Sequence, residues 1–235
     1  MHNFAVISGG TKGIGRSLIE KFAEKKFDIV TCARTEKDLN KLKDQIEKAF
    51  TGITLYIFRA DLSKKQDINK FSKYILSLNR PIDVLINNTG LFIPGQIHNE
   101  PEGTLEKMIE TNLYSAYYLT RGLIDIMIQR KKGYIFNICS TASIIAYTNG
   151  GSYGISKFAM LGMSKVLREE MKAYNIRVTS VLPGATYTAS WQGVDIPQER
   201  FMKSEDVAQT VWTAYNLSPQ SVVEEILIRP LQGDL

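Results

Sequence analysis

The stretch FAVISGGTKGIG at residues 4–15 decides the fold of this chain, because an apolar run passes directly into a glycine-rich turn. The turn carries Gly9, Gly13 and Gly15, and the residues after it continue in a helical pattern. Glycine accepts the positive φ angle of a sharp turn and lets the backbone approach a phosphate closely. The N-terminus of the following helix would point its N–H groups at that negative charge. This order predicts the first βα unit of a dinucleotide-binding fold.

Apolar runs and helical patterns alternate along the rest of the chain. The runs predict strands at 4–9, 28–33, 54–61, 83–88, 133–140, 177–183 and 224–229. Helical patterns lie near 14–25, 36–50, 65–78, 103–130, 153–174 and 204–215. Strands that are apolar on both faces, each followed by a helix, are typical of a parallel sheet covered on both sides. We therefore expect an α/β fold: a single Rossmann-type domain over residues 1–235, with a doubly wound parallel sheet of about seven strands and a substrate loop at about 185–201.

The composition is that of an ordinary globular protein, with 44% hydrophobic and 23% charged residues. The net charge of +5 is mild and the lysines alternate with acids, so we expect no nucleic-acid partner. No apolar run approaches the length of a membrane span, and no leader precedes the first strand, so cytoplasm is the expected location. Cys32 and Cys139 each lie in an apolar run, which favours buried thiols over a disulfide.

The end of the second predicted strand reads TCARTEK, where a chain that prefers NAD usually has an acid for the ribose 2′-hydroxyl. This chain has Arg34 there, and the glycine turn adds Lys12. A permanently charged guanidinium suits a 2′-phosphate, which an acid would repel. We therefore expect NADP(H) to be preferred over NAD(H). The alternative is that both side chains are solvated surface cations.

The stretch CSTASIIAYTNGGSYGISKF at residues 139–158 holds the candidate catalytic groups. Tyr153 and Lys157 are one helical turn apart and would share a helix face. Ser140 ends a predicted strand, so it would lie at the carboxyl edge of the sheet, where such folds bind ligands. A tyrosine four residues before a lysine is common by chance, so its context matters more than the spacing.

Five motifs in order resemble the short-chain dehydrogenase/reductase family. They are SGGTKGIG (8–15), ADL (60–62), NNTG (87–90), the set Asn112, Ser140, Tyr153 and Lys157, and PGATYT (183–188). Ser8 stands where threonine is usual and Thr89 where alanine is usual; by this resemblance Thr89 adds a hydroxyl beside the cofactor but touches no proposed proton-transfer group. The resemblance implies the following cofactor-binding residues: Gly9, Thr11, Lys12, Gly13, Ile14, Gly15, Arg34, Asp61, Leu62, Asn88, Gly90, Tyr153, Lys157, Pro183, Gly184 and Thr188.

The resemblance implies an NADP(H)-dependent reductase that converts a carbonyl to an alcohol, with no metal. Tyr153 would be the general acid, and a nearby Lys157 would lower the pKa of its phenol, which is about 10 in water. Lys157 would also hold the cofactor ribose, and Ser140 would bind the substrate oxygen. Asn112 would position a water that links Lys157 to solvent. Its alternative interpretation is an amide that binds backbone at a helix bend.

Substrate contacts are expected from loops beyond the carboxyl edge, with Tyr147 and Trp191 as candidate aromatic contacts to a flat carbonyl compound. PGATYTASW and SVVEEILIRPLQGDL resemble the corresponding segments of bacterial sepiapterin reductases, which reduce side-chain carbonyls of a pterin. Another small carbonyl or an acyl-carrier-bound keto substrate is the alternative. A binding protein that senses NADP(H) is a third possibility. The family resemblance also implies a homodimer or homotetramer.

Overall fold

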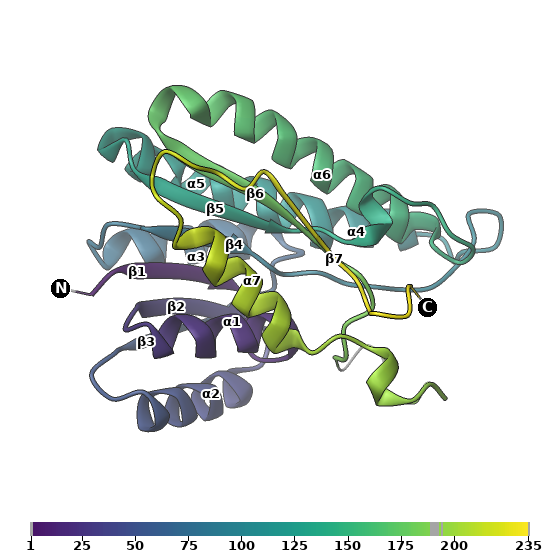
Figure 1. Ribbon diagram of the computed structural model, residues 1–235, viewed down its shortest axis with the longest axis horizontal. Coiled ribbons are helices and arrows are strands. Elements are labelled where there is room, and N and C mark those ends of the chain that lie inside the picture. Colours follow the sequence, from purple (N-terminus) through teal and green to yellow (C-terminus); the bar gives the residue numbers. More distant parts are fainter. Residues whose placement is uncertain (1, 189–192, 194, 235) are drawn as a thin grey trace.

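The structure, a computed structural model, describes residues 2–188, 193 and 195–234. Seven parallel strands form one sheet in the order β3-β2-β1-β4-β5-β6-β7 (Figure 1). The strands are β1 (Phe4–Ser8), β2 (Asp28–Ala33), β3 (Leu55–Arg59), β4 (Val84–Asn87), β5 (Gly133–Ile138), β6 (Ile176–Pro183) and β7 (Glu225–Ile228). The predicted doubly wound parallel sheet is therefore confirmed.

Helices cover both faces of this sheet. They are α1 (Gly13–Glu24), α2 (Glu36–Ala49), α3 (Lys65–Ser77), α4 (Thr104–Ile109), α5 (Ser115–Arg130), α6 (Gly151–Met171) and α7 (Ser204–Tyr215). Side chains point alternately to the two faces of each strand, so the core has one half on each face of the sheet. Ala5 and Ile7 of β1 pack with α1, α2 and α7, whereas Phe4 and Val6 pack with α3 and α5. A separate apolar cluster, with Cys139 and Met160 among its members, lies beneath α6.

The helical stretch predicted near 103–130 is confirmed at Thr104–Arg130, but it is not α-helical throughout. A π-helical turn, η1 (Glu110–Tyr114), separates α4 from α5. Asn112 lies at the centre of this turn, where its side chain binds the backbone of Leu91 through two hydrogen bonds. A π turn inserts one residue into the helical repeat and often marks a functional site. Here it brings a polar side chain to the carboxyl edge of the sheet.

Two buried acids connect segments at the amino edge of the sheet. Asp28 accepts hydrogen bonds from the Thr54 amide at 2.7 Å and from Arg80 Nη1 at 2.9 Å. Asp83 accepts one from the Phe4 amide at 2.9 Å, and its other oxygen lies 3.2 Å from an Arg130 nitrogen. Burial opposes the charge of Asp28, but these donors outweigh it and lower the pKa of the carboxyl.

None of the helices in the described part of the chain is both long and apolar enough to cross a bilayer.

Candidate active site

The structure places the four predicted catalytic residues near one another, although they come from three separate segments. Ser140 follows the end of β5, and Tyr153 and Lys157 lie in the first two turns of α6. Asn112 comes from the η1 turn. Each of these segments ends or begins at the carboxyl edge of the sheet, and the parallel topology therefore brings the four side chains together.

Ser140 and Tyr153 form the polar centre of the site. The Ser140 hydroxyl interacts with the Tyr153 phenol and acts to lower its pKa. Ser140 is itself fixed, since its Oγ accepts the Ala142 amide at 3.1 Å and its own amide donates to Ser143 Oγ at 3.2 Å. The ring of Phe92 packs edge-on against Tyr153, with 4.8 Å between the ring centroids. The two hydroxyls are therefore held together beside an aromatic wall.

Lys157 lies beneath this pair and is only 5% exposed. Its ammonium donates to the Ile138 carbonyl at 2.9 Å and lies 5.8 Å from the centroid of the Tyr153 ring. Burial lowers the pKa of Lys157, and the neighbouring Cys139 opposes this only in part. Among the ion pairs of the described residues none involves Lys157, so a carboxylate does not neutralise it. A buried cation of this kind suits a ligand rich in oxygen atoms.

The expected lowering of the Tyr153 pKa is not observed. Burial raises the pKa of Tyr153 above its ordinary value, and the hydrogen bond from Ser140 offsets only part of this rise. The physical reason is desolvation, which disfavours the phenolate in an apolar surrounding. At neutral pH the phenol is thus protonated, which is the form that a general acid requires.

Asn112 has the geometry of the alternative interpretation, an amide that fixes a helix bend. Its Oδ1 accepts the Leu91 amide at 2.6 Å, and its Nδ2 donates to the Leu91 carbonyl at 2.9 Å and to Ser156 Oγ at 2.8 Å. Asn112 also lies near Lys157. A Cβ placed on Gly90 would be 3.5 Å from Asn112 Oδ1 and 3.7 Å from Lys157 Nζ. The water link predicted for Asn112 stays a prediction.

The glycine turn has the conformation that its sequence predicts. Gly9 and Gly13 have φ angles of 68° and 52°, in the region that favours glycine. A Cβ on Gly15 would lie 2.3 Å from the Gly9 carbonyl oxygen and 2.4 Å from Asn88 Nδ2. Asn88 supports the turn, because its Nδ2 donates to the carbonyls of Ser8 and Gly9 at 3.0 and 3.1 Å. Thr11 and Ile14 lie within this turn, partly exposed.

Two arginines, Arg34 and Arg59, lie side by side beyond β2 and β3. Lys12 and Arg34 are both exposed beyond the carboxyl ends of β1 and β2. Arg59 at the end of β3 was missed, and its Nε donates to the Arg34 carbonyl at 3.2 Å. The sequence could have indicated Arg59, because the second and third strands were both predicted and parallel neighbours end at the same edge of a sheet.

The remaining cofactor candidates lie along the same edge. Asp61 is bound by the Ser63 hydroxyl at 2.9 Å, and the side chain of Leu62 is buried in the core, so only its backbone can meet a ligand. Pro183 ends β6, and the Gly184 amide donates to the Ile228 carbonyl at 2.8 Å. Thr188 lies against the glycine turn, since its Cγ2 is 2.9 Å from a Cβ placed on Gly13.

The structure describes one of the two aromatic residues that were predicted to contact the substrate. Tyr147 is half-exposed, and the burial of its phenol, with a smaller contribution from Tyr153, raises its pKa to about 12. Trp191 lies outside the described residues. Tyr187 packs against Phe201, with 5.7 Å between the ring centroids.

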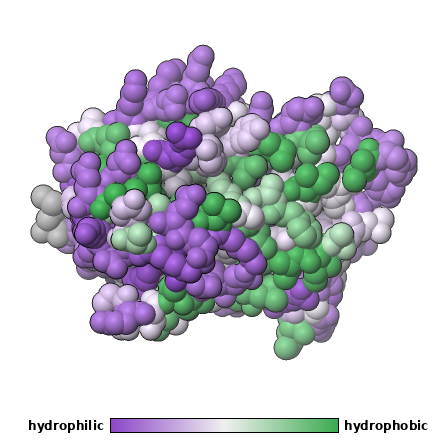
Figure 2. Space-filling view, turned by 90° about the horizontal axis from the view of Figure 1, so that it is seen from above, coloured by the Kyte–Doolittle hydropathy of each residue, from purple (hydrophilic) through white to green (hydrophobic). Residues whose placement is uncertain are grey.

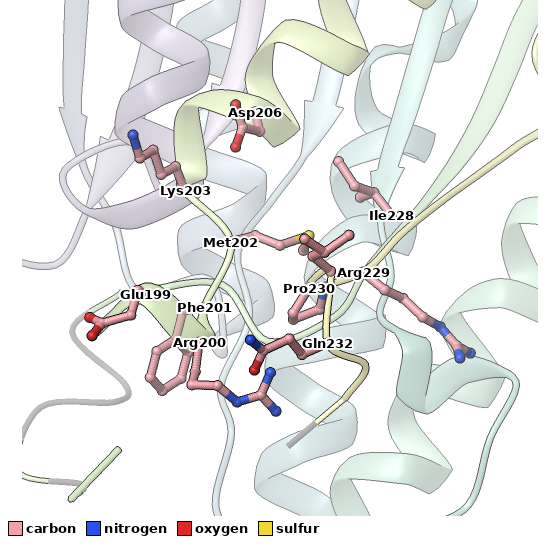
Figure 3. Close-up of a pocket in the computed structure, with 11 residues that line it drawn as sticks. Glu199, Arg200, Phe201, Met202, Lys203, Asp206, Ile228, Arg229, Pro230 and Gln232 are labelled. Atoms are coloured by element: carbon pink, nitrogen blue, oxygen red, sulfur yellow. The ribbon is translucent and has the colours of Figure 1, made fainter. Parts of the chain in front are cut away.

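A pocket of about 390 Å³ lies beyond β7, between the η5 turn (Gln198–Arg200) and the residues that follow β7 (Figure 3). Its lining includes Arg200, Met202, Arg229 and Gln232, whereas the four predicted catalytic residues are not part of it. The chain after β7 passes over the cofactor segment, because a Cβ on Gly184 would lie 2.8 Å from Asp234 Oδ1 and 3.0 Å from Pro230 Cδ. The pocket is thus adjacent to this segment but distinct from the Ser140–Tyr153 pair.

Glu100 is a second residue that the sequence did not reveal. Its carboxylate accepts the Ser152 amide at 2.9 Å and also the Ser152 hydroxyl, at the first turn of α6. Gly150, at the N-cap position of α6, has no side chain that could accept these hydrogen bonds. Glu100 accepts them from a distant loop and thus caps the helix. Tyr153 is the next residue after Ser152, and its helix is therefore anchored to the 91–101 loop.

The two cysteines are free and buried, as predicted. Burial raises the pKa of Cys32 to about 12 and that of Cys139 to about 11. Thiols with such values carry almost no thiolate at neutral pH, and Cys139 packs with Met160 and Leu161, which favours a packing role over a nucleophile.

Known proteins resemble this chain over its full length. Sepiapterin reductase from Chlorobaculum tepidum is 33% identical over 243 residues, covering 100% of this chain and 99% of the relative. The NADP-dependent 3-hydroxy acid dehydrogenase YdfG of Escherichia coli is 28% identical, covering 94% of this chain and 86% of that protein. A metagenomic short-chain oxidoreductase solved in complex with NADP superposes with a TM-score of 0.84 at 28% identity, covering 97% of this chain and 96% of the other.

The sequence model described as short chain dehydrogenase matches residues 3–198. The chain therefore belongs to the short-chain dehydrogenase/reductase family and is an NAD(P)-dependent oxidoreductase. The residues present fit such a cofactor. The glycine turn brings no side chains to positions where a Cβ would clash with neighbouring atoms. The Lys157 ammonium is buried without a carboxylate partner among the described residues.

Proposed function

We propose that this protein is an NADP(H)-dependent carbonyl reductase whose substrate is a flat ketone or dicarbonyl of the sepiapterin type. The observation that carries the proposal is the meeting of Ser140 and Tyr153 with the buried Lys157, whose ammonium lies 5.8 Å from the centroid of the tyrosine ring. A protonated phenol next to a second hydroxyl suits proton delivery to a carbonyl oxygen. The match to a sepiapterin reductase over the whole chain, including the segments around the site, supports the pterin.

The mechanism assigns one task to each of the four residues. When bound, the nicotinamide supplies the hydride. Ser140 donates a hydrogen bond to the substrate oxygen, and Tyr153 delivers the proton to the same oxygen. Lys157 binds cofactor oxygens and stabilises the phenolate that remains after transfer. Asn112, whose Oδ1 has a second lone pair beyond its bond to Leu91, positions a water that returns a proton toward Lys157.

The test of this function is the loss of NADPH absorbance with sepiapterin, a set of small ketones and diketones, and an acyl-carrier keto thioester. Fast reduction of sepiapterin supports the proposal. Turnover only with the other carbonyls contradicts the pterin and keeps the reductase. Tight NADPH binding without turnover of any carbonyl contradicts the reductase and favours a protein that senses NADP(H).

The preference for NADP(H) rests on the exposed cations Lys12 and Arg34. Arg34→Asp replaces a donor to the 2′-phosphate with a group that repels it. A hydrogen bond to a charged group contributes about 1.5–3 kcal/mol, so we expect the Kd for NADPH to rise at least about tenfold. NADH lacks this phosphate, and its Kd should change by less than about threefold. Both constants are measured by fluorescence titration.

Lys48→Asp, at the far end of α2, makes the same change of charge at another exposed position and is the matched control. It should leave both affinities unchanged. Equal effects of the two substitutions would mean that Arg34 acts only through the overall charge of the surface, and the preference for NADP(H) would lose its basis.

We also propose that the chain assembles as a homodimer or homotetramer through α6. Figure 2, which looks from above onto the side where α6 lies in Figure 1, shows hydrophobic side chains gathered on this face. Ile155, Phe158 and Val166 of α6 are 42%, 47% and 58% exposed. Light scattering should give a multiple of the 26.5 kDa chain mass, and Val166→Glu should shift it toward the monomer. A monomeric mass for the unmodified protein would contradict this assembly.

A further inference from the structure

The loop between β4 and α4 is joined to the start of α6 at two places. Gly95 forms a parallel bridge with Gly150, and its amide donates to the Asn149 carbonyl at 3.1 Å. Further along the same loop, the carboxylate of Glu100 accepts the Ser152 amide at 2.9 Å and also the Ser152 hydroxyl. The first turn of α6 is therefore fastened to a loop that is distant in the sequence.

The side chain of Glu100 fits a space that two glycines leave open. A Cβ on Gly95 would lie 2.6 Å from Glu100 Cγ, and a Cβ on Gly151 would overlap the Glu100 carboxylate. The first amides of a helix have no partner within the helix, and a negative charge at this end is favourable. Ser152 is only 2% exposed, so water cannot readily replace the carboxylate. Glu100 thus supplies the acceptor that this helix start requires.

The same loop holds Tyr153 from two sides. Its backbone follows Ser152 directly, and its ring packs edge-on against Phe92, with 4.8 Å between the ring centroids. Lys157 lies one helical turn further on, and its ammonium is bound to a backbone carbonyl at the end of β5. Loss of the Glu100 contact would therefore displace the phenol of Tyr153 more than the ammonium of Lys157.

We infer that Glu100 is a positioning residue for proton delivery. Its carboxylate fixes the first turn of α6 through Ser152, and this keeps the Tyr153 phenol beside Ser140 and within reach of the substrate oxygen. A displacement of about 1 Å at a reacting group can lower the rate about 10²-fold. The inference rests on the proposed reductase function and adds to it a residue that acts through another.

The test compares two substitutions of Glu100. Glu100→Ala removes both hydrogen bonds, so we expect the kcat for carbonyl reduction to fall about 10–100-fold, with the KM for the carbonyl and the Kd for NADPH within about threefold. Glu100→Gln should keep at least about a third of the kcat, because its carbonyl can accept the Ser152 amide and its amino group can donate to the Ser152 hydroxyl. NADPH absorbance gives kcat and KM, and fluorescence titration gives Kd.

Glu102→Ala is the matched control, since it removes an exposed carboxylate from the same loop and should keep full activity. If Glu100→Ala does not fold, Ser152→Ala takes its place, because it loses the hydroxyl bond alone and should lower kcat about 3–10-fold. A normal kcat, an equal loss in Glu100→Gln or Glu102→Ala, or a loss that lies in the Kd for NADPH would overturn the inference. An unmodified protein that reduces no carbonyl would overturn the proposed function and this inference with it, so the two failures are distinguishable.

Discussion

Tyr153→Phe is expected to lower the kcat for carbonyl reduction by about 10²–10⁴-fold, the range that a positioned general acid contributes. The substitution removes only the hydroxyl. The ring that packs edge-on against Phe92 remains, and so does its place in α6. The Kd for NADPH should therefore stay close to that of the unmodified protein. The loss of NADPH absorbance with the best substrate of the panel measures kcat, and fluorescence titration measures binding.

Tyr174→Phe is the matched control, because Tyr174 lies just past the far end of α6 and is 37% exposed. It loses the same hydroxyl and should keep full activity. Near-normal turnover of Tyr153→Phe would mean that another group delivers the proton, and the assignment of Ser140 and Lys157 would need revision as well.

Gly15→Ala should have the second large effect, on cofactor binding. Its Cβ would lie 2.3 Å from the Gly9 carbonyl oxygen, and that oxygen belongs to the backbone of a tight turn. Overpacking of this kind costs about 1–3 kcal/mol. The turn must shift away from the position that receives the pyrophosphate, so we expect the Kd for NADPH to rise at least about tenfold. Titration of the purified variant gives the value.

Gly162→Ala provides the comparison for this change. Gly162 lies in the exposed part of α6, and an added Cβ there would meet nothing within 4 Å. Gly162 shares the exposed face of α6 with Phe158 and Val166, so the comparison uses NADPH binding alone, which should be normal. If Gly15→Ala also bound NADPH as the unmodified protein does, the glycine turn would not be the cradle of the cofactor.

The sequence predicted the features that depend on local pattern. All seven strands appear within a few residues of their expected limits, because apolar runs bounded by helical patterns are a local property. The position of Ser140, Tyr153 and Lys157 at one edge followed from the parallel topology. These predictions required no knowledge of contacts between distant residues.

The sequence did not predict features that arise from distant contacts. The sequence offered a helix bend at Asn112 only as an alternative, because the hydrogen bonds to Leu91 join distant residues that helical periodicity does not relate. The cap that Glu100 provides to α6 joins residues 52 positions apart. The pKa of Tyr153 follows from its burial, which outweighs the hydrogen bond from Ser140, and a spacing of four residues from Lys157 does not reveal burial.

The buried acids Asp28 and Asp83 have a consequence for how this protein can be altered. They connect strands and loops at the amino edge of the sheet, whereas the four proposed catalytic side chains lie at the opposite edge. The contacts that stabilise the sheet and the groups that select the substrate thus lie at opposite edges of the sheet. The loop segments at 93–99 and 144–149 can diverge toward new carbonyl compounds while the charged contacts that hold the sheet remain untouched. Substrate specificity can therefore change in this fold without a change in the contacts that hold the sheet.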